Sequence, residues 1–223
     1  MNNRRIKVFS GAIACFVACT GDFLSMFILG SKCPGYSQIS DPISYLGAST
    51  CPVSGLFSFI SIILGLLIMV FAFGLRAAWS PADRYVKIGF WLLILYALGE
   101  GLGSGLFKTN FINHSLSASF IIHDILGGIG IFALLTLMII VPKIERFSGS
   151  RSFLAFSKIV FLFGLLLLLF FSQRFLRRWN SISAGIAVYT GFWQRLLLLD
   201  FYIYLIVIAV RTLKRRGDLT VPA

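Results

Sequence analysis

The sequence predicts an all-α polytopic membrane protein, a bundle of six transmembrane helices forming a single domain over residues 1–223. Hydrophobic residues make up 58% of the chain, and only 13% of its residues are charged. The mean hydropathy is +0.90. Soluble domains carry about 25% charged residues, so this composition excludes an ordinary soluble fold.

Six apolar runs are each long enough to cross the hydrocarbon core as a helix, which takes about 20 residues. The predicted spans, in chain order, are 6–29, 53–75, 86–107, 119–141, 153–173 and 186–210. The first run follows three basic residues, as a signal peptide would. Its apolar character continues past Asp22, however, so we expect an uncleaved first helix.

Basic residues concentrate on one side of the predicted membrane. Thirteen of the 20 precede the first span, follow the sixth, or lie between spans two and three or four and five: Arg4, Arg5, Lys7, Arg76, Arg84, Lys87, Lys143, Arg146, Arg151, Arg211, Lys214, Arg215 and Arg216. By the positive-inside rule, both termini are cytoplasmic, and a bacterial inner membrane is the expected location. The net charge of +12 then reflects topology and contact with anionic membrane lipids, and no nucleic-acid partner is expected.

Basic residues on the opposite side are few. Arg174, Arg177 and Arg178 stand out at the end of the fifth span, together with Trp179. They either contact headgroups of the outer leaflet or snorkel from a helix end.

Four cysteines fall into two pairs. Cys33 and Cys51 flank the first outer loop, on the oxidising side in this topology, so they form a disulfide or remain as two interfacial thiols. Cys15 and Cys19 lie one helical turn apart within the first span, where we expect them to serve as small packing residues.

Ionisable residues inside the apolar runs indicate a site. Asp22, Glu100, Asp124 and Arg195 belong to four different spans, and at about 1.5 Å per residue all lie roughly 5–9 Å outward of the centre of their span. Such groups cost several kcal/mol in hydrocarbon unless they pair or face water, so we expect them to meet in one cavity. A structural ion pair of Arg195 with Glu100 or Asp124 is the alternative. Three acids facing one arginine leave surplus negative charge, which favours a functional site.

Other polar residues are candidates for binding groups near these four. They are Ser104, His123, Gln194 and Asp200 in the spans, and Asp41, Ser44 and His114 in the two outer loops. The spacing of Ala97, Gly101 and Gly105 on one face of the third span predicts close approach of a neighbouring helix.

Several short motifs also carry a resemblance. They are Gly21-Asp22, the loop Ile39-Ser40 to Ile43-Ser44-Tyr45-Leu46-Gly47, Gly99-Glu100-Gly101-Leu102-Gly103-Ser104-Gly105-Leu106-Phe107, His123-Asp124 and Gly191-Phe192-Trp193-Gln194-Arg195-Leu196. In order and topology the chain resembles the six-helix membrane proteins of domain-of-unknown-function family 998 (DUF998), and more distantly it is similar to DRAM/Sfk-type membrane proteins. The resemblance implies the architecture and a pocket built from these positions, and it implies no reaction.

The favoured function is an outward-facing polar pocket that binds a lipid or other amphiphile, or that does chemistry on its headgroup as a hydrolase or transferase. In an enzyme, Asp22, Glu100 or Asp124 would act as acid or base and Arg195 would stabilise an anion. A proton-coupled carrier or scramblase-like transporter using Asp200 is one alternative, and a structural or regulatory subunit is another.

No cofactor is expected from the sequence. The alternative is a zinc ion held by His114, His123 and Asp124, although the chain has only two histidines and a zinc hydrolase of this kind would want about three.

Overall fold

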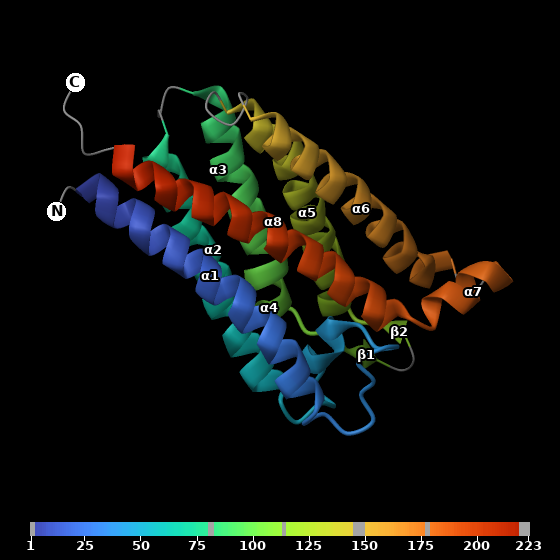
Figure 1. Ribbon diagram of the computed structural model, residues 1–223. Helices are drawn as coiled ribbons and strands as arrows, with labels where there is room; N and C mark the ends of the chain where they lie inside the picture. Colours follow the sequence, from blue (N-terminus) through green and yellow to red (C-terminus); the bar gives the residue numbers. More distant parts are fainter. Residues whose placement is uncertain (1–2, 80–82, 113–114, 145–149, 177–178, 219–223) are drawn as a thin grey trace.

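Six long apolar helices make up most of the computed structural model, which describes residues 3–79, 83–112, 115–144, 150–176 and 179–218 (Figure 1). The helices long and apolar enough to span a membrane are Asn3–Gly30, Ser54–Ala78, Arg84–Leu106, Ala118–Lys143, Arg151–Leu176 and Thr190–Arg215. The predicted all-α class and the six spans are thereby confirmed, and the protein is an integral membrane protein.

Four of the spans are built on single α-helices. These are α1 (Asn3–Gly30), α2 (Ser54–Ala78), α6 (Arg151–Leu176) and α8 (Thr190–Asp218). The fourth span consists of α5 (Ala118–Ile140), which continues into the short 3-10 helix η3 (Val141–Lys143). A proline in η3 has no N–H for the helical ladder, which fits an end at this point.

The third span changes its winding near one end. It begins as α3 (Arg84–Tyr96), passes into the π-helix η2 (Ala97–Gly103) and ends as the short α4 (Ser104–Leu106). A π-helical segment is rare, and within helices it is frequently found at functional sites. The segment carries Glu100.

The termini and the longer connections lie at opposite ends of the bundle. Both chain ends lie together, whereas the other end carries the loop with the 3-10 helix η1 (Ile43–Gly47), the hairpin of β1 (Phe111–Ile112) and β2 (Ser115–Leu116), and α7 (Ser181–Ala187) (Figure 1). We call the latter the loop end. The two strands pair antiparallel with Phe111 opposite Leu116 and Ile112 opposite Ser115.

The sixth span begins later than predicted. Residue 186 belongs to α7, and α8 starts at Thr190 after a turn. The turn is held by hydrogen bonds from Tyr189 N to Ile186 O (3.1 Å) and from Thr190 Oγ1 to Ala187 O (2.6 Å). Ile186, Ala187 and Val188 continue the apolar run up to this turn, so the predicted span began too early.

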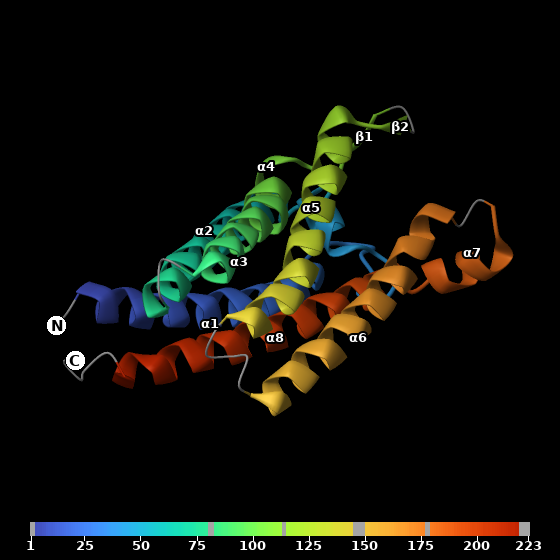
Figure 2. The ribbon, with the colours of Figure 1, turned by 90° about the horizontal axis from the view of Figure 1, so that it is seen from above.

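Close packing between helices is uneven. Gly11 of α1 and Gly74 of α2 let these two helices touch, since a Cβ on Gly11 would lie 2.7 Å from Gly74 Cα. In contrast, α5 and α6 lie nearest each other close to their connection and diverge toward the loop end (Figures 1 and 2). The core of buried side chains includes Phe71, Leu134 and Phe201, each fully buried. The divergence leaves room on one side of the bundle.

Candidate ligand-binding cavity

A cavity of about 350 Å³ lies between α1, α2, η2, α5, α6 and α8, on the side of the bundle where α5 and α6 diverge. Seven of the residues predicted for the site line it: Asp22, Ser44, Glu100, Ser104, His123, Asp124 and Gln194. Five separate segments of the chain therefore contribute polar groups to one space.

The rest of the wall is apolar and leads to the surface that faces lipid. Ile131 and Phe132 of α5 and Leu168, Phe171 and Phe175 of α6 line the cavity. Phe132 is 63% exposed and Phe175 is 56% exposed, so both also belong to the outer surface of the bundle. In Figure 2, the two helices that carry them lie apart at the loop end. The cavity thus opens sideways, between α5 and α6.

Glycine contacts on both sides fix the π-helix that carries Glu100. A Cβ on Gly101 would lie 2.4 Å from Gly65 Cα in α2, and a Cβ on Gly99 would lie 2.3 Å from the carbonyl oxygen of Leu126 in α5. The predicted close approach at Gly101 is confirmed. Gly130 continues the contact, because its Cβ would lie 3.0 Å from Glu100 Cγ. Backbone therefore packs on backbone around Glu100, which leaves its position little freedom.

The three carboxylates differ in their partners. Asp22 accepts a hydrogen bond from the Tyr202 hydroxyl of α8. Asp124 forms an ion pair with Arg174, at 3.3 Å between Oδ1 and the guanidinium. Within the described part of the chain, the Glu100 carboxylate has no hydrogen-bond or ion-pair partner, although it lines the cavity. Glu100 is therefore the acid left free to meet a ligand.

A narrow extension joins Glu100 to the bundle interior. This smaller cavity of about 40 Å³ shares Asp22, Glu100 and Ser61 with the main one and reaches Tyr96 and Tyr202. Its volume suits a water molecule or two but no organic group.

Two buried hydroxyls also face the main cavity without partners. Ser44 and Ser61 are each 7% exposed and line the cavity, and neither hydroxyl makes a hydrogen bond to another described residue. His123 Nδ1 lies 3.0 Å from the carbonyl oxygen of Phe107, so that atom has a partner. Each hydroxyl faces the cavity and is therefore available to water or to a ligand.

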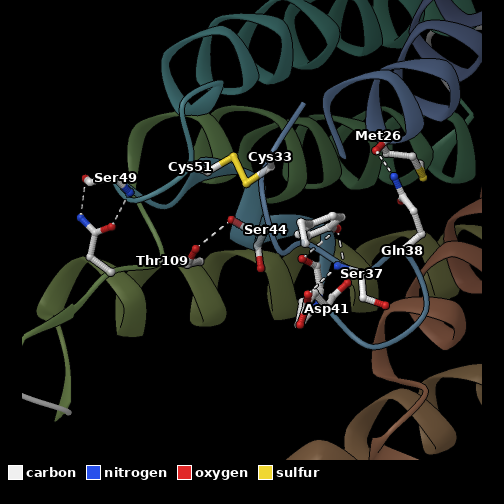
Figure 3. The surroundings of a disulfide bond; sticks show 12 residues. Met26, Cys33, Ser37, Gln38, Asp41, Ser44, Ser49, Cys51 and Thr109 are labelled. Carbon is white, nitrogen blue, oxygen red and sulfur yellow. Dashed lines mark hydrogen bonds between the residues drawn. A yellow bond between two sulfur atoms is a disulfide. The ribbon is translucent and has the colours of Figure 1, made fainter. Parts of the chain in front are cut away.

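The first long loop closes the cavity at the loop end. Its helix η1 places Ile43 and Ser44 in the cavity wall, and Gln194 Oε1 accepts a hydrogen bond from Ile43 N at 2.8 Å. Thr109 Oγ1 donates to Ser44 O at 2.7 Å (Figure 3). These bonds attach the loop to α8 and to the segment after α4.

A disulfide ties together the ends of the same loop. Cys33 and Cys51 are paired with their Cα atoms 5.4 Å apart, which is the first of the two alternatives that the sequence left open (Figure 3). Nearby, Asn110 and Ser49 exchange two hydrogen bonds, of 2.8 and 3.0 Å (Figure 3). Cys15 and Cys19 are buried and free, as expected for packing residues.

Arg195 holds this loop and does not pair with the carboxylates of the cavity. Its guanidinium donates to Tyr36 Oη (2.7 Å), Gln38 Oε1 (2.5 Å) and the carbonyl oxygens of Gly191 (2.8 Å) and Asp41 (3.3 Å). The predicted ion pair with Glu100 or Asp124 is therefore not formed. Arg195 points toward the loop and not toward these carboxylates.

The phenol of Tyr36 completes this network. Burial raises the pKa of Tyr36 above its ordinary value, and the charge of Arg195 opposes the rise. The hydroxyl consequently keeps its proton at neutral pH and donates it to the carbonyl oxygen of Pro42 at 3.2 Å. One phenol thus links the guanidinium to the start of η1.

Arg174, and not Arg195, forms the ion pair with Asp124. Its guanidinium carbon lies 4.3 Å from the ring centre of Phe171 and 4.5 Å from that of Phe175, while one nitrogen pairs with Asp124. The sequence had suggested a headgroup contact or snorkelling for this residue. Arg177 and Arg178 lie outside the described residues. Arg174 therefore bridges the two diverging helices α5 and α6.

Two further residues predicted for the site, Asp41 and Asp200, do not line the main cavity. Asp41 Oδ2 accepts a hydrogen bond from Ser37 N at 2.7 Å within the loop. Asp200 is 6% exposed and packs against α6, where a Cβ on Gly164 would lie 2.9 Å from its Oδ2. His114 lies outside the described residues. The predicted zinc site of His114, His123 and Asp124 therefore stays a prediction. Among the described residues no group of three or more His, Cys, Asp and Glu side chains is arranged to hold a metal.

Sequence reasoning did not predict three residues of the site, which are Ser61, Arg174 and Tyr202. The last of them, Tyr202, lines the smaller cavity. It lies on α8 in an apolar run beside Tyr204, with nothing in the sequence to distinguish the two. Tyr204 instead lies 3.4 Å from Ser157 Oγ on α6. Tyr202 shares a helix face with Leu198, and both residues line the smaller cavity.

The comparison with known families agrees with the motifs. The family described as "Protein of unknown function (DUF998)" matches residues 13–211. No curated protein and no solved structure shows a significant match. The more distant resemblance to DRAM/Sfk-type proteins stays a prediction. With the six spans and the matched region covering most of its length, the chain belongs to the DUF998 family.

Proposed function

We propose that the protein binds a membrane lipid or other amphiphile in this cavity. The polar headgroup would lie at Asp22, Glu100 and Asp124, and the hydrocarbon chain would leave between Phe132 and Phe175. The observation that carries the proposal is one cavity with a cluster of carboxylates inside and an apolar exit toward lipid. Its volume, about 350 Å³, lies in the range of small-molecule sites.

The site is proposed to face outward in a bacterial inner membrane, with both termini in the cytoplasm. Two observations support this orientation. The basic residues favour the end that carries the termini. The Cys33–Cys51 disulfide lies at the loop end, and disulfides persist on the oxidising side of such membranes.

A purely structural role for the polar cluster explains less. Tyr202 and Arg174 could lock the helices through Asp22 and Asp124. A locking function has no need for Glu100, because a carboxylate inside a membrane span costs free energy that no partner within the described chain offsets. A ligand in the cavity accounts for Glu100 and for the space beside it.

Filling the cavity tests the proposal. Gly128 lines the cavity, and a Cβ there would meet no atom within 4 Å, so Gly128→Leu should fold and occupy the space. Gly185→Leu is the matched control, because Gly185 lies in α7 and a Cβ there also meets nothing within 4 Å.

The readout is mass spectrometry of the lipids that remain with each purified protein. We expect wild type and Gly185→Leu to retain a common lipid or amphiphile, and Gly128→Leu to lose it at unchanged thermal stability. Equal retention by all three proteins would contradict the proposal.

A further inference from the structure

We propose that the cavity selects an amphiphile with a cationic headgroup, a primary ammonium group in particular. This inference rests on the proposed function and names its ligand class. The charges that line the cavity are three carboxylates and one guanidinium among the described residues. The surplus is negative, and in a space of low dielectric constant either a proton or a cationic ligand neutralises it.

The carboxylates of the cavity differ in whether they already have a partner in the protein. Arg174 is committed to Asp124 and to the rings of Phe171 and Phe175. Tyr202 supplies a neutral donor to Asp22. Within the described chain, Glu100 has neither a guanidinium nor a hydroxyl as a partner. Its two carboxylate oxygens are therefore the acceptors available to a cation.

The neighbouring hydroxyls fit the same ligand. An ammonium group has three N–H donors and no acceptor. Ser44 and Ser61, each 7% exposed and without a hydrogen-bond partner in the described residues, add two acceptor oxygens to the same cavity. These hydroxyls are an observation independent of the acidic cluster, and Ser61 lines both cavities together with Glu100.

The space beside Glu100 admits such a group. Gly127 and Gly128 form the facing wall on α5, and a Cβ on Gly127 would lie 3.3 Å from Glu100 Oε1. Two adjacent glycines keep this wall without side chains. A carboxylate or sulfate headgroup in the same place would face Asp22, Glu100 and Asp124, with the one guanidinium already paired.

Direct binding of tritiated hexadecylamine to the full-length protein in an uncharged maltoside detergent tests the inference. Unlabelled hexadecylamine, hexadecanol, hexadecanoate and butylamine serve as competitors, so that headgroup charge and chain length vary separately. We expect hexadecylamine to compete at least tenfold better than the alcohol, and hexadecanoate not to compete, because charge-assisted hydrogen bonds are about twice as strong as neutral ones.

Variants identify the carboxylate responsible. Glu100→Gln should weaken hexadecylamine binding at least tenfold, and Glu100→Asp should retain part of it because the charge remains. Asp83→Asn is the matched control: it also removes one negative charge, at the N-cap of α3 and outside the cavity lining, and asparagine is an equally good cap. It should bind like wild type, and thermal unfolding of each variant verifies folding.

The outcomes separate the two proposals. If the alcohol or the acid competes as well as the amine, the ammonium inference is overturned and the binding function stands. If butylamine competes as well as hexadecylamine, the site takes a soluble amine and no amphiphile. If tritiated hexadecylamine binds wild type no better than Gly128→Leu, the ammonium inference is overturned, and the lipid-retention experiment with the same variant decides the binding function separately.

Discussion

Gly101 of η2 and Gly65 of α2 face each other so closely that a Cβ on Gly101 would lie 2.4 Å from Gly65 Cα. The contact holds the segment that presents Glu100. We expect Gly101→Ala to destabilise the protein by about 1–3 kcal/mol, as is typical of overpacking, because backbone atoms cannot yield as a flexible side chain does. Thermal unfolding in detergent measures the loss.

Gly55→Ala provides the control for this change. Gly55 also lies in α2, but a Cβ there meets nothing within 4 Å. Its stability should stay within about 0.5 kcal/mol of wild type, as for most surface substitutions. Equal losses of stability in the two variants would show that the contact between Gly101 and Gly65 does not contribute to stability.

The hydrogen bond from Tyr202 to Asp22 joins α8 to α1 inside the bundle. We expect Tyr202→Phe to cost about 1–3 kcal/mol, because it leaves a buried acceptor without its donor. Tyr204→Phe is the comparison on the same helix, since its hydroxyl makes only long contacts of 3.4 Å with Ser157 and Met138. A double-mutant cycle with Asp22→Asn measures the coupling, and additive effects would show that the bond contributes nothing.

Arg195 should order the first loop without supporting the rest of the bundle. We expect Arg195→Ala to speed amide hydrogen exchange in residues 36–46, because four hydrogen bonds to the loop and its neighbour Gly191 are lost. Exchange in α2 and α3 should not change. Lys32→Ala, at an exposed position of the same loop, is the control. Unchanged exchange in the loop of Arg195→Ala would contradict the assigned role.

The disulfide gives a test of topology as well as of covalent structure. Non-reduced peptide mapping should find Cys33 joined to Cys51, with Cys15 and Cys19 free. In a bacterial host, green fluorescent protein fused to the C-terminus should fluoresce, since it folds in the cytoplasm. A dark fusion, or a Cys33 thiol that is free in protein purified without reductant, would contradict the proposed orientation.

Hydropathy was sufficient for the six spans because a bilayer demands about 20 apolar residues from any helix that crosses it. It failed at the start of α8, because the apolar residues 186–188 belong to α7 and the turn after it and not to the span. The π-helix was also missed, since its winding depends on contacts of Gly99 and Gly101 with neighbouring helices.

The candidate site was also predicted only in part. Counting residues along each helix placed Asp22, Glu100 and Asp124 at matching depth, and the structure finds them on one cavity. The same count placed Arg195 beside them, because depth along a helix says nothing of the direction in which a side chain points. The partner of Asp124 is Arg174, which only the tilt of α6 against α5 could reveal.

The π-helix has a consequence for how the third span tolerates length changes. A π turn accommodates one residue more than an α turn, so η2 amounts to a single added residue absorbed in mid-helix. Deleting one residue between Ala97 and Gly103 would restore regular winding and leave the helical segments on either side in their present orientation, because the π turn absorbs the added residue. Only side chains within η2, Glu100 among them, would change direction while the chain still spanned the bilayer, so that a shortened protein would insert normally and yet lose its site.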